Sequence, residues 1–518
     1  MPEGRSAKSV RNVATGIANK VLLMVLAFAT RTLFIRLLGA EYTGVSSLYT
    51  NILSVLSLAE MGMGNVLMFN LYGALKDKDE DRIASLVNEF RKIYSAIIVI
   101  VLSIGVLLIP FLRFIVHSPL DSRELIGYYL LYLVNSVASY FVVYRTIVLS
   151  ADQKSFISNI VHTAATVAMY ILQILYLLLR KDFWGYLIIQ VLCTIGSNLI
   201  LNGISLKHYP YLKKRRAIAA AEAIDKRDLF GNIKATFLFK IADTILDQTD
   251  SIIISIMFGT VMVGYYSNYF VLISYIVAIA GIIANGLVAS FGNLQTEGDM
   301  ERSYDMFRVA LTAFSIFGAV CTSCYACVVQ DFVPVWVGAQ YVMPYGLVIA
   351  ILAVFYLRMA TNTLWMYRSA MGLFREVQYI NLAAAALNIV LSVLLGKLMG
   401  VAGVIVATAV SRILTSFWFE GKVVFQRFRK PAATYFLLQA KSFGVCILAV
   451  AASYGACCCI KGNAYAVIAL KLCTAAAVSF LITLIAYGRT PEFKTMKKKL
   501  LSVLYRKKSR RNDETSRS

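Results

Sequence analysis

The stretch FLFKIADTILDQTDSIIISIMFG, residues 237–259, decides the fold class of this chain and raises the first question about its function. Its length and apolar character are those of a helix that crosses a bilayer. It nevertheless carries four charged residues: Lys240, Asp243, Asp247 and Asp250. Their spacing of i, i+3, i+7 and i+10 places them within roughly 80° on one side of a helix. The stretch therefore predicts a membrane-spanning helix with one ionic stripe, which must face a partner or a polar cavity.

Apolar segments of similar length recur along the whole chain. Of its 518 residues, 59% are hydrophobic and 15% are charged, and the mean hydropathy is +0.70. A soluble protein of this size needs more polar residues to cover its surface. The segments are continuously apolar rather than alternating, which argues against a β-barrel. The sequence predicts an all-α polytopic membrane protein with about fourteen transmembrane helices.

The formal net charge of +23 is distributed unevenly along this pattern. In the predicted topology, about 36 of the 51 Lys and Arg residues lie in segments on the side of the N-terminus, against about 6 on the opposite side. This bias predicts cytoplasmic N- and C-termini, with the basic loops and tail facing anionic lipids. Nucleic acid is not an expected partner. The first apolar run is too long for a signal-peptide core, so we expect it to be kept as the first span.

A shift of the chain by 220 residues aligns its two halves. The residues matched by this shift are Asn12 with Asn232, Lys20 with Lys240, Gly39 with Gly259, Gly44 with Gly264, Ser47 with Ser267, Tyr49 with Tyr269, and Ser54 with Ser274. Each half begins after an even number of spans, so the repeat is parallel. The sequence thus predicts two pseudo-repeated six-helix bundles around a central cavity, plus two C-terminal helices.

The predicted segments follow from this repeat and from the basic stretches. They are an N-terminal six-helix bundle at 1–206, a basic cytoplasmic linker at 207–231, a second six-helix bundle at 232–430, two additional helices at 431–487, and a basic cytoplasmic tail at 488–518.

Ionisable residues inside predicted spans are the candidate functional residues, because each costs at least about 2.5–3.5 kcal/mol to insert. The cationic candidates for an anion-binding cavity are Lys20, Arg31, Lys240, Arg358 and Arg412. The acidic candidates for a coupling-ion or charge-pairing role are Glu60, Asp243, Asp247 and Asp250. The alternative interpretation is structural: these charges pair with one another and hold helices together. Phosphate suits the cations, whereas the acidic residues leave open H⁺ coupling, Na⁺ coupling, or the positioning of a lysine.

The sequence offers no catalytic or metal centre. The nine cysteines fall in apolar spans away from the three histidines, which favours packing over metal binding. No nucleotide-binding glycine loop is present and no predicted loop is long enough for a catalytic domain, so we do not expect an enzyme. No cofactor is expected.

The stretch TRTLFIRLLGAEYTGVSSLYTNILSVLSLAEMGMGNVLMFNLY, residues 30–72, resembles the opening of the bacterial polysaccharide-biosynthesis exporters. These are the O-antigen and capsule flippases of the multidrug/oligosaccharidyl-lipid/polysaccharide (MOP) superfamily. The stretch NGLVASFGNLQTEGD, residues 285–299, resembles the end of their eighth span. The resemblance implies a fourteen-span flippase in the bacterial cell membrane. It would move undecaprenyl-diphosphate-linked oligosaccharide to the outer leaflet by alternating access, and polysaccharide polymerase or assembly proteins would be its partners.

Three other functions remain open from the sequence. A multidrug cation antiporter of the same fold would use the acidic stripe Asp243, Asp247 and Asp250. A related flippase for a peptidoglycan lipid precursor is the second of these. A membrane-embedded polysaccharide polymerase or ligase is disfavoured, because the sequence shows no paired acids in a loop.

Overall fold

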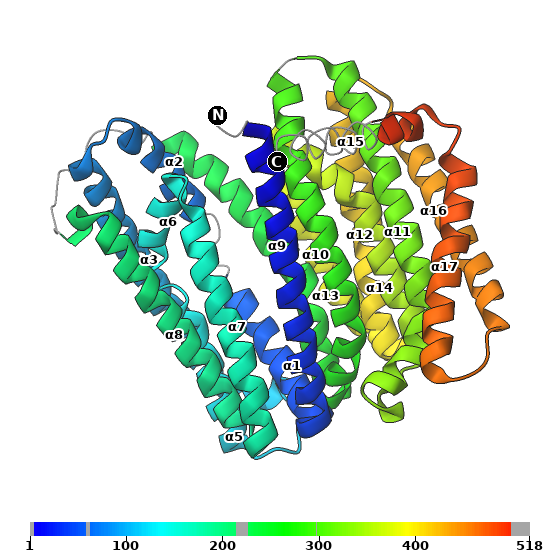
Figure 1. The fold of residues 1–518 in the computed structure, drawn as a ribbon, viewed down its shortest axis with the longest axis horizontal. Helices are drawn as coiled ribbons and strands as arrows, with labels where there is room; N and C mark the ends of the chain where they lie inside the picture. The colour runs from blue at the N-terminus through cyan, green and yellow to red at the C-terminus, as the bar shows by residue number, and fades with distance from the viewer. Residues whose placement is uncertain (1–4, 58–62, 214–225, 297, 499–518) are drawn as a thin grey trace, which may run out of the picture. The chain divides into compact units, whose positions relative to one another are not determined.

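The helices of this chain are shown in Figure 1, which draws the computed structural model. The structure describes residues 5–57, 63–213, 226–296 and 298–498. Contacts between Cα atoms divide the chain into two compact units, Met1–Ser267 and Asn268–Ser518. The predicted five-segment division stays a prediction, and residues 214–225 of its linker lie outside the described residues.

The first unit is built from α-helices with short connections. They are α1 (Arg5–Leu56), α2 (Met63–Lys76), α3 (Glu80–Leu107), α4 (Leu112–Ile115), α5 (Ser122–Ala138), α6 (Val143–Ala151), α7 (Ser155–Arg180), α8 (Phe183–His208), α9 (Lys226–Phe258) and the start of α10 (Thr260–Thr296), with the short helices η2 (Ile109–Phe111) and η3 (Pro210–Lys213) between them.

The second unit continues in the same manner. After the rest of α10 come α11 (Met300–Trp336), η4 (Ala339–Tyr341), α12 (Tyr345–Met371), α13 (Phe374–Met399), α14 (Val401–Arg412), the π-helical turn η5 (Ile413–Phe417), α15 (Trp418–Arg427), α16 (Ala432–Cys458) and α17 (Ala464–Tyr487).

The predicted number of membrane spans agrees with these helices. Within the described residues, 12 helical segments are long and apolar enough to cross a membrane. One of them, Asn19–Leu56, covers most of the first predicted span and the beginning of the second, and Gly39 interrupts α1 between them with φ 90° and ψ −174°. The charged stretch 237–259, predicted as a span, lies mostly in α9, which is not among the 12. The all-α, multi-pass architecture of about fourteen helices is therefore confirmed.

The internal repeat appears in the backbone at the ends of matching helices. Gly39 and Gly259 have φ of +90° and +89°, a conformation that L-residues with a Cβ rarely adopt. The next matched turn has φ 55° at Lys78 and φ 76° at Gly298, again 220 residues apart. Directly after Lys78 and Gly298, an aspartate caps the following helix.

These two caps have the same geometry. Asp79 Oδ1 accepts from the Arg82 backbone N–H at 2.9 Å, and Asp299 Oδ1 accepts from the Arg302 N–H at 3.0 Å. An aspartate at this position satisfies one of the N–H groups that the first helical turn leaves without a partner. The repeat seen in the sequence is thus a repeat of helix starts and stops.

The two C-terminal helices, α16 and α17, pack into the second unit beside α11 (Figure 1). Ser315 Oγ of α11 donates to Ser442 Oγ of α16 at 2.9 Å, and Tyr356 of α12 donates to the Ser442 carbonyl at 2.7 Å. Lys471 of α17 pairs with Asp331 of α11 at 2.6 Å. These bonds tie both helices to the core of the unit.

Candidate functional site

The ionic stripe of α9 becomes more buried toward its carboxyl end. Lys240 is exposed, Asp243 and Asp247 are half-buried, and Asp250 is 7% exposed. At this buried end α9 packs against α1, where Asn51 Nδ2 donates to Ser251 Oγ at 2.7 Å. The stripe therefore runs from an exposed lysine to a carboxyl group buried within the first unit.

Arg31 is a cationic candidate of the first unit that forms a hydrogen bond between two helices. It lies half-buried on α1, eight residues before the break at Gly39, and its Nη2 donates to Ser267 Oγ of α10 at 2.7 Å. The structure therefore places a guanidinium group against a neutral hydroxyl group inside a span. Lys20, a cationic candidate eleven residues earlier on the same helix, is exposed.

The cationic candidates of the second unit lie on α12 and at the end of α14. Arg358 is half-buried on α12, and Arg412 is half-buried as the last residue of α14. The π-helical turn Ile413–Phe417 follows Arg412 directly. Such turns are rare and often occur at functional sites. Glu60, the remaining acidic candidate, lies outside the described residues.

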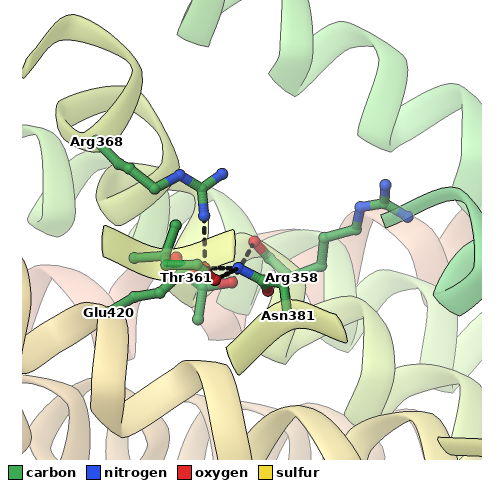
Figure 2. A network of polar contacts seen from close by, with 6 residues as sticks. Arg358, Thr361, Arg368, Asn381 and Glu420 are labelled. Atoms are coloured by element: carbon green, nitrogen blue, oxygen red, sulfur yellow. Dashed lines mark hydrogen bonds and ion pairs between the residues drawn. The ribbon is translucent and has the colours of Figure 1, made fainter. Parts of the chain in front are cut away.

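A buried polar network in the second unit was missed by the sequence analysis. Arg368 of α12 and Glu420 of α15 form an ion pair at 2.5 Å, with side chains only 3% and 10% exposed. Asn381 of α13 donates to the same Glu420 oxygen at 3.0 Å. Figure 2 shows Arg368 and Asn381 meeting at Glu420, whereas the guanidinium of Arg358 lies on the other side of the view.

This network joins three helices and has the features of a structural ion pair. Each charged group is desolvated and each has a partner of opposite charge or an amide. Arg368 and Glu420 both lie near the ends of predicted spans, where a charged side chain ordinarily reaches water. Their depth in the bundle follows from how α12, α13 and α15 pack, which the sequence pattern does not contain.

The first unit also contains a neutral polar pocket that the sequence analysis did not predict. This pocket of about 300 Å³ is lined by hydroxyl and amide side chains of α1, α5 and α8, including Thr50, Ser54, Tyr132, Asn135 and Gln190. None of its lining residues is Asp, Glu, Lys or Arg. We call it the hydroxyl pocket. No sequence signal was available, because serine and threonine are common in packed membrane helices.

A second pocket of about 200 Å³ adjoins the hydroxyl pocket. Ser139 lines both pockets, and Thr194 of the second pocket donates to Asn135 Oδ1 of the first at 2.7 Å. The second pocket is lined by α5, α7 and α8 and also contains His162 and Asn198.

In the part of the chain that the structure describes, no three His, Cys, Asp or Glu residues lie close enough to hold a metal ion. Cys327 and Cys457 pack with Ala475 in an apolar cluster between α11, α16 and α17.

Comparisons with known proteins place the fold. The chain is similar to the lipid II flippase MurJ in an inward closed conformation, with a TM-score of 0.65, 14% identity, and coverage of 91% of this chain and 98% of MurJ. It is also similar to an inward-facing multidrug resistance MATE transporter of the MOP superfamily, with a TM-score of 0.60, 11% identity, and coverage of 79% and 95%. The MATE multidrug transporter DinF-BH gives a TM-score of 0.57 at 15% identity, covering 82% and 96%.

Neither a family model nor a curated protein matches the chain. At these identities the structural likeness shows the fold alone. This chain is thus a multi-pass membrane protein with the fold of MOP-superfamily transporters.

Proposed function

We propose that this chain is a flippase that moves an undecaprenyl-diphosphate-linked oligosaccharide from the cytoplasmic to the outer leaflet of a bacterial cell membrane. In this proposal both termini are cytoplasmic and the protein works by alternating access as a transporter, with no catalytic step. The cargo is a repeat unit of O-antigen, capsule or exopolysaccharide. Polymerase or assembly proteins would take over the delivered unit.

The observation that carries the proposal is the position of Arg31. Arg31 lies within an apolar helix, and its guanidinium group donates a hydrogen bond to the neutral hydroxyl of Ser267. An arginine at this depth is costly to insert, so an intramembrane arginine is a functional-site hypothesis by default. A diphosphate is the membrane-borne anion that a planar, permanently charged guanidinium recognises best. In the second unit, Arg358 and Arg412 remain the candidates for binding an anion.

The fold of this chain is shared with a flippase and with drug transporters, and the matches differ in how much of the chain they cover. The match to MurJ covers 91% of this chain, whereas the matches to the two multidrug transporters cover 79% and 82%. A flippase for a peptidoglycan lipid precursor remains an alternative, since MurJ is described as a lipid II flippase.

A cation antiporter is the second candidate, and the burial of Asp250 favours it. A carboxyl group that is 7% exposed within an ionic stripe suits a cationic drug or a coupling ion. In the flippase proposal, Asp243, Asp247 and Asp250 would instead hold the H⁺ or Na⁺ that drives transport.

Depletion of the protein in its native host tests these functions against one another. The flippase proposal predicts that a complete lipid-linked oligosaccharide accumulates on the cytoplasmic leaflet. Accumulation of a peptidoglycan precursor would identify the alternative cargo. Unchanged lipid-linked pools with altered tolerance to cationic drugs would overturn the flippase proposal in favour of the antiporter.

Complementation with Arg31 variants then tests the residue itself. Arg31→Ala should abolish transport, and Arg31→Lys should restore part of it, because lysine keeps the charge without the planar fork. Arg36→Ala is the matched control, since Arg36 is an exposed arginine on the same helix. Full transport by Arg31→Ala would remove the main support for the proposal.

A further inference from the structure

We propose that the hydroxyl pocket of the first unit is a binding subsite for the sugar part of the cargo. This inference rests on the proposed function and adds the place and the chemistry by which the glycan is recognised. Sugar hydroxyl groups both donate and accept hydrogen bonds, and they carry no charge. A pocket that binds them needs neutral donors and acceptors with aromatic surface close by.

The hydroxyl pocket has this composition inside a membrane-spanning bundle. Its lining combines serine and threonine hydroxyls, the amides of Asn135 and Gln190, and the rings of Tyr132 and Tyr140. Its residues include no Asp, Glu, Lys or Arg. A site for a cationic drug would instead place carboxylates or bare aromatic faces around the ligand.

The hydrogen bonds of the lining residues leave acceptors facing the pocket. Thr50 Oγ1 donates to the Ser46 carbonyl at 2.8 Å, and Ser54 Oγ donates to the Thr50 carbonyl at 2.8 Å. The Ser54 hydroxyl uses its one proton on its own helix, so its oxygen can accept a hydrogen bond from a ligand. Both hydroxyl groups are solvated or half-buried rather than sealed in the core.

Asn135 supplies the complementary donor. Thr194 Oγ1 shares its proton between Asn135 Oδ1 at 2.7 Å and the Gln190 carbonyl at 3.0 Å. With Oδ1 placed on Thr194, Nδ2 is the atom of Asn135 that can donate to a ligand. Gln190, one turn before Thr194 on α8, brings a second amide to the same pocket. The pocket therefore offers both partners that a sugar hydroxyl requires.

Tyr132 connects the pocket to α1, the helix that carries Arg31. It lines the hydroxyl pocket and shares a hydrogen bond with Ser46 of α1 at 2.6 Å. In this proposal a ligand whose diphosphate is bound by Arg31 extends its sugar toward the pocket. The adjoining pocket of about 200 Å³, beyond the Asn135–Thr194 bond, offers room for the glycan to continue.

A binding experiment on the purified full-length protein separates this inference from the proposed function. Two probes are compared: lipid-linked oligosaccharide extracted from the depleted host, and undecaprenyl diphosphate, which has no sugar. We expect Asn135→Ala and Gln190→Ala each to weaken binding of the glycolipid by roughly three- to tenfold. Binding of undecaprenyl diphosphate should be unchanged in both. Arg31→Ala should weaken binding of both probes.

Control variants make the result specific. Asn159→Ala removes an exposed amide on α7 outside either pocket and should alter neither affinity. Gln190→Ala provides a second test if loss of the Thr194 bond lowers the stability of Asn135→Ala. Equal loss for both probes, or no loss for the glycolipid, would overturn the sugar subsite while leaving the flippase proposal standing. Failure of the unsubstituted protein to bind either probe would overturn both.

Discussion

Gly44 of α1 and Gly264 of α10 face each other so closely that neither helix has room for a Cβ at this point. A Cβ on Gly44 would lie 3.2 Å from the Gly264 nitrogen and would clash with the Thr260 carbonyl. A Cβ on Gly264 would lie 3.1 Å from the Gly44 nitrogen and would clash with the Ala40 carbonyl. Small residues at such crossings allow membrane helices to approach at backbone distance.

Substitution of Gly44 by alanine should destabilise the first unit. The clashing atoms belong to the backbone of another helix, so they cannot move aside as a flexible side chain would. We expect a loss of about 1–3 kcal/mol, the usual range for overpacking, measured as a lower midpoint of thermal unfolding in detergent. Gly281→Ala on α10 is the control, because its added Cβ meets nothing within 4 Å. Equal midpoints for the two variants would contradict the close approach.

Removal of one partner from the buried Arg368–Glu420 pair should be more damaging. Glu420→Gln leaves the Arg368 guanidinium, only 3% exposed, without its counter-charge, and such losses amount to about 3–5 kcal/mol. The comparison is Arg427→Ala, which breaks the exposed pair with Glu376 and should change stability by about 0–1 kcal/mol. Denaturation in mixed micelles measures both. A small effect of Glu420→Gln would show that the pair is not desolvated.

Alanine substitutions of Arg358 and Arg368, ten residues apart on α12, should separate an effect on transport from an effect on stability. We expect Arg358→Ala to lose polysaccharide transport while keeping a normal unfolding midpoint and membrane level. Arg368→Ala should lower the midpoint of thermal unfolding, because the Arg368 side chain belongs to the Glu420 network. Cell-surface polysaccharide is measured beside the amount and thermal midpoint of each variant. Loss of stability in Arg358→Ala with transport intact would reverse the assignment.

Asp152, in the loop after α6, should make stability depend on pH. Its hydrogen bonds with Lys154 at 2.8 Å and with the Tyr209 hydroxyl at 2.7 Å hold its pKa below the usual carboxyl value. A group with a lowered folded-state pKa stabilises above the unfolded-state pKa of about 3.9, and this contribution is lost as pH falls through the folded-state pKa.

The unfolding midpoint of Asp152→Asn should therefore lie below that of the unsubstituted protein at neutral pH. The difference should shrink as the pH falls below about 4. Glu89→Gln, which removes the exposed pair with Lys92, is the control and should show little difference at any pH. A gap for Asp152→Asn that persists unchanged into acid would rule out the carboxylate as its cause.

Much of the architecture could be predicted from local sequence. The 220-residue shift pairs Gly39 with Gly259, and both residues adopt a positive φ, a conformation that favours glycine. The caps at Asp79 and Asp299 are also local, because each aspartate accepts a hydrogen bond from a backbone N–H three residues later. The roles assigned to Lys20, Arg31, Lys240, Arg358 and Arg412 remain predictions.

The sequence by itself determined the membrane class, the number of spans and the internal repeat, because hydrophobic length, turn residues and helix caps act over a few neighbouring positions. Only the tertiary structure decided which polar residues meet. Glu420 pairs with Arg368, which is 52 residues away in the sequence. Asn135 bonds to Thr194, which is 59 residues away. A polar side chain in a span has the same local pattern whether it faces a partner, a pocket or water. Its role therefore depends on helix packing, which only the folded chain specifies.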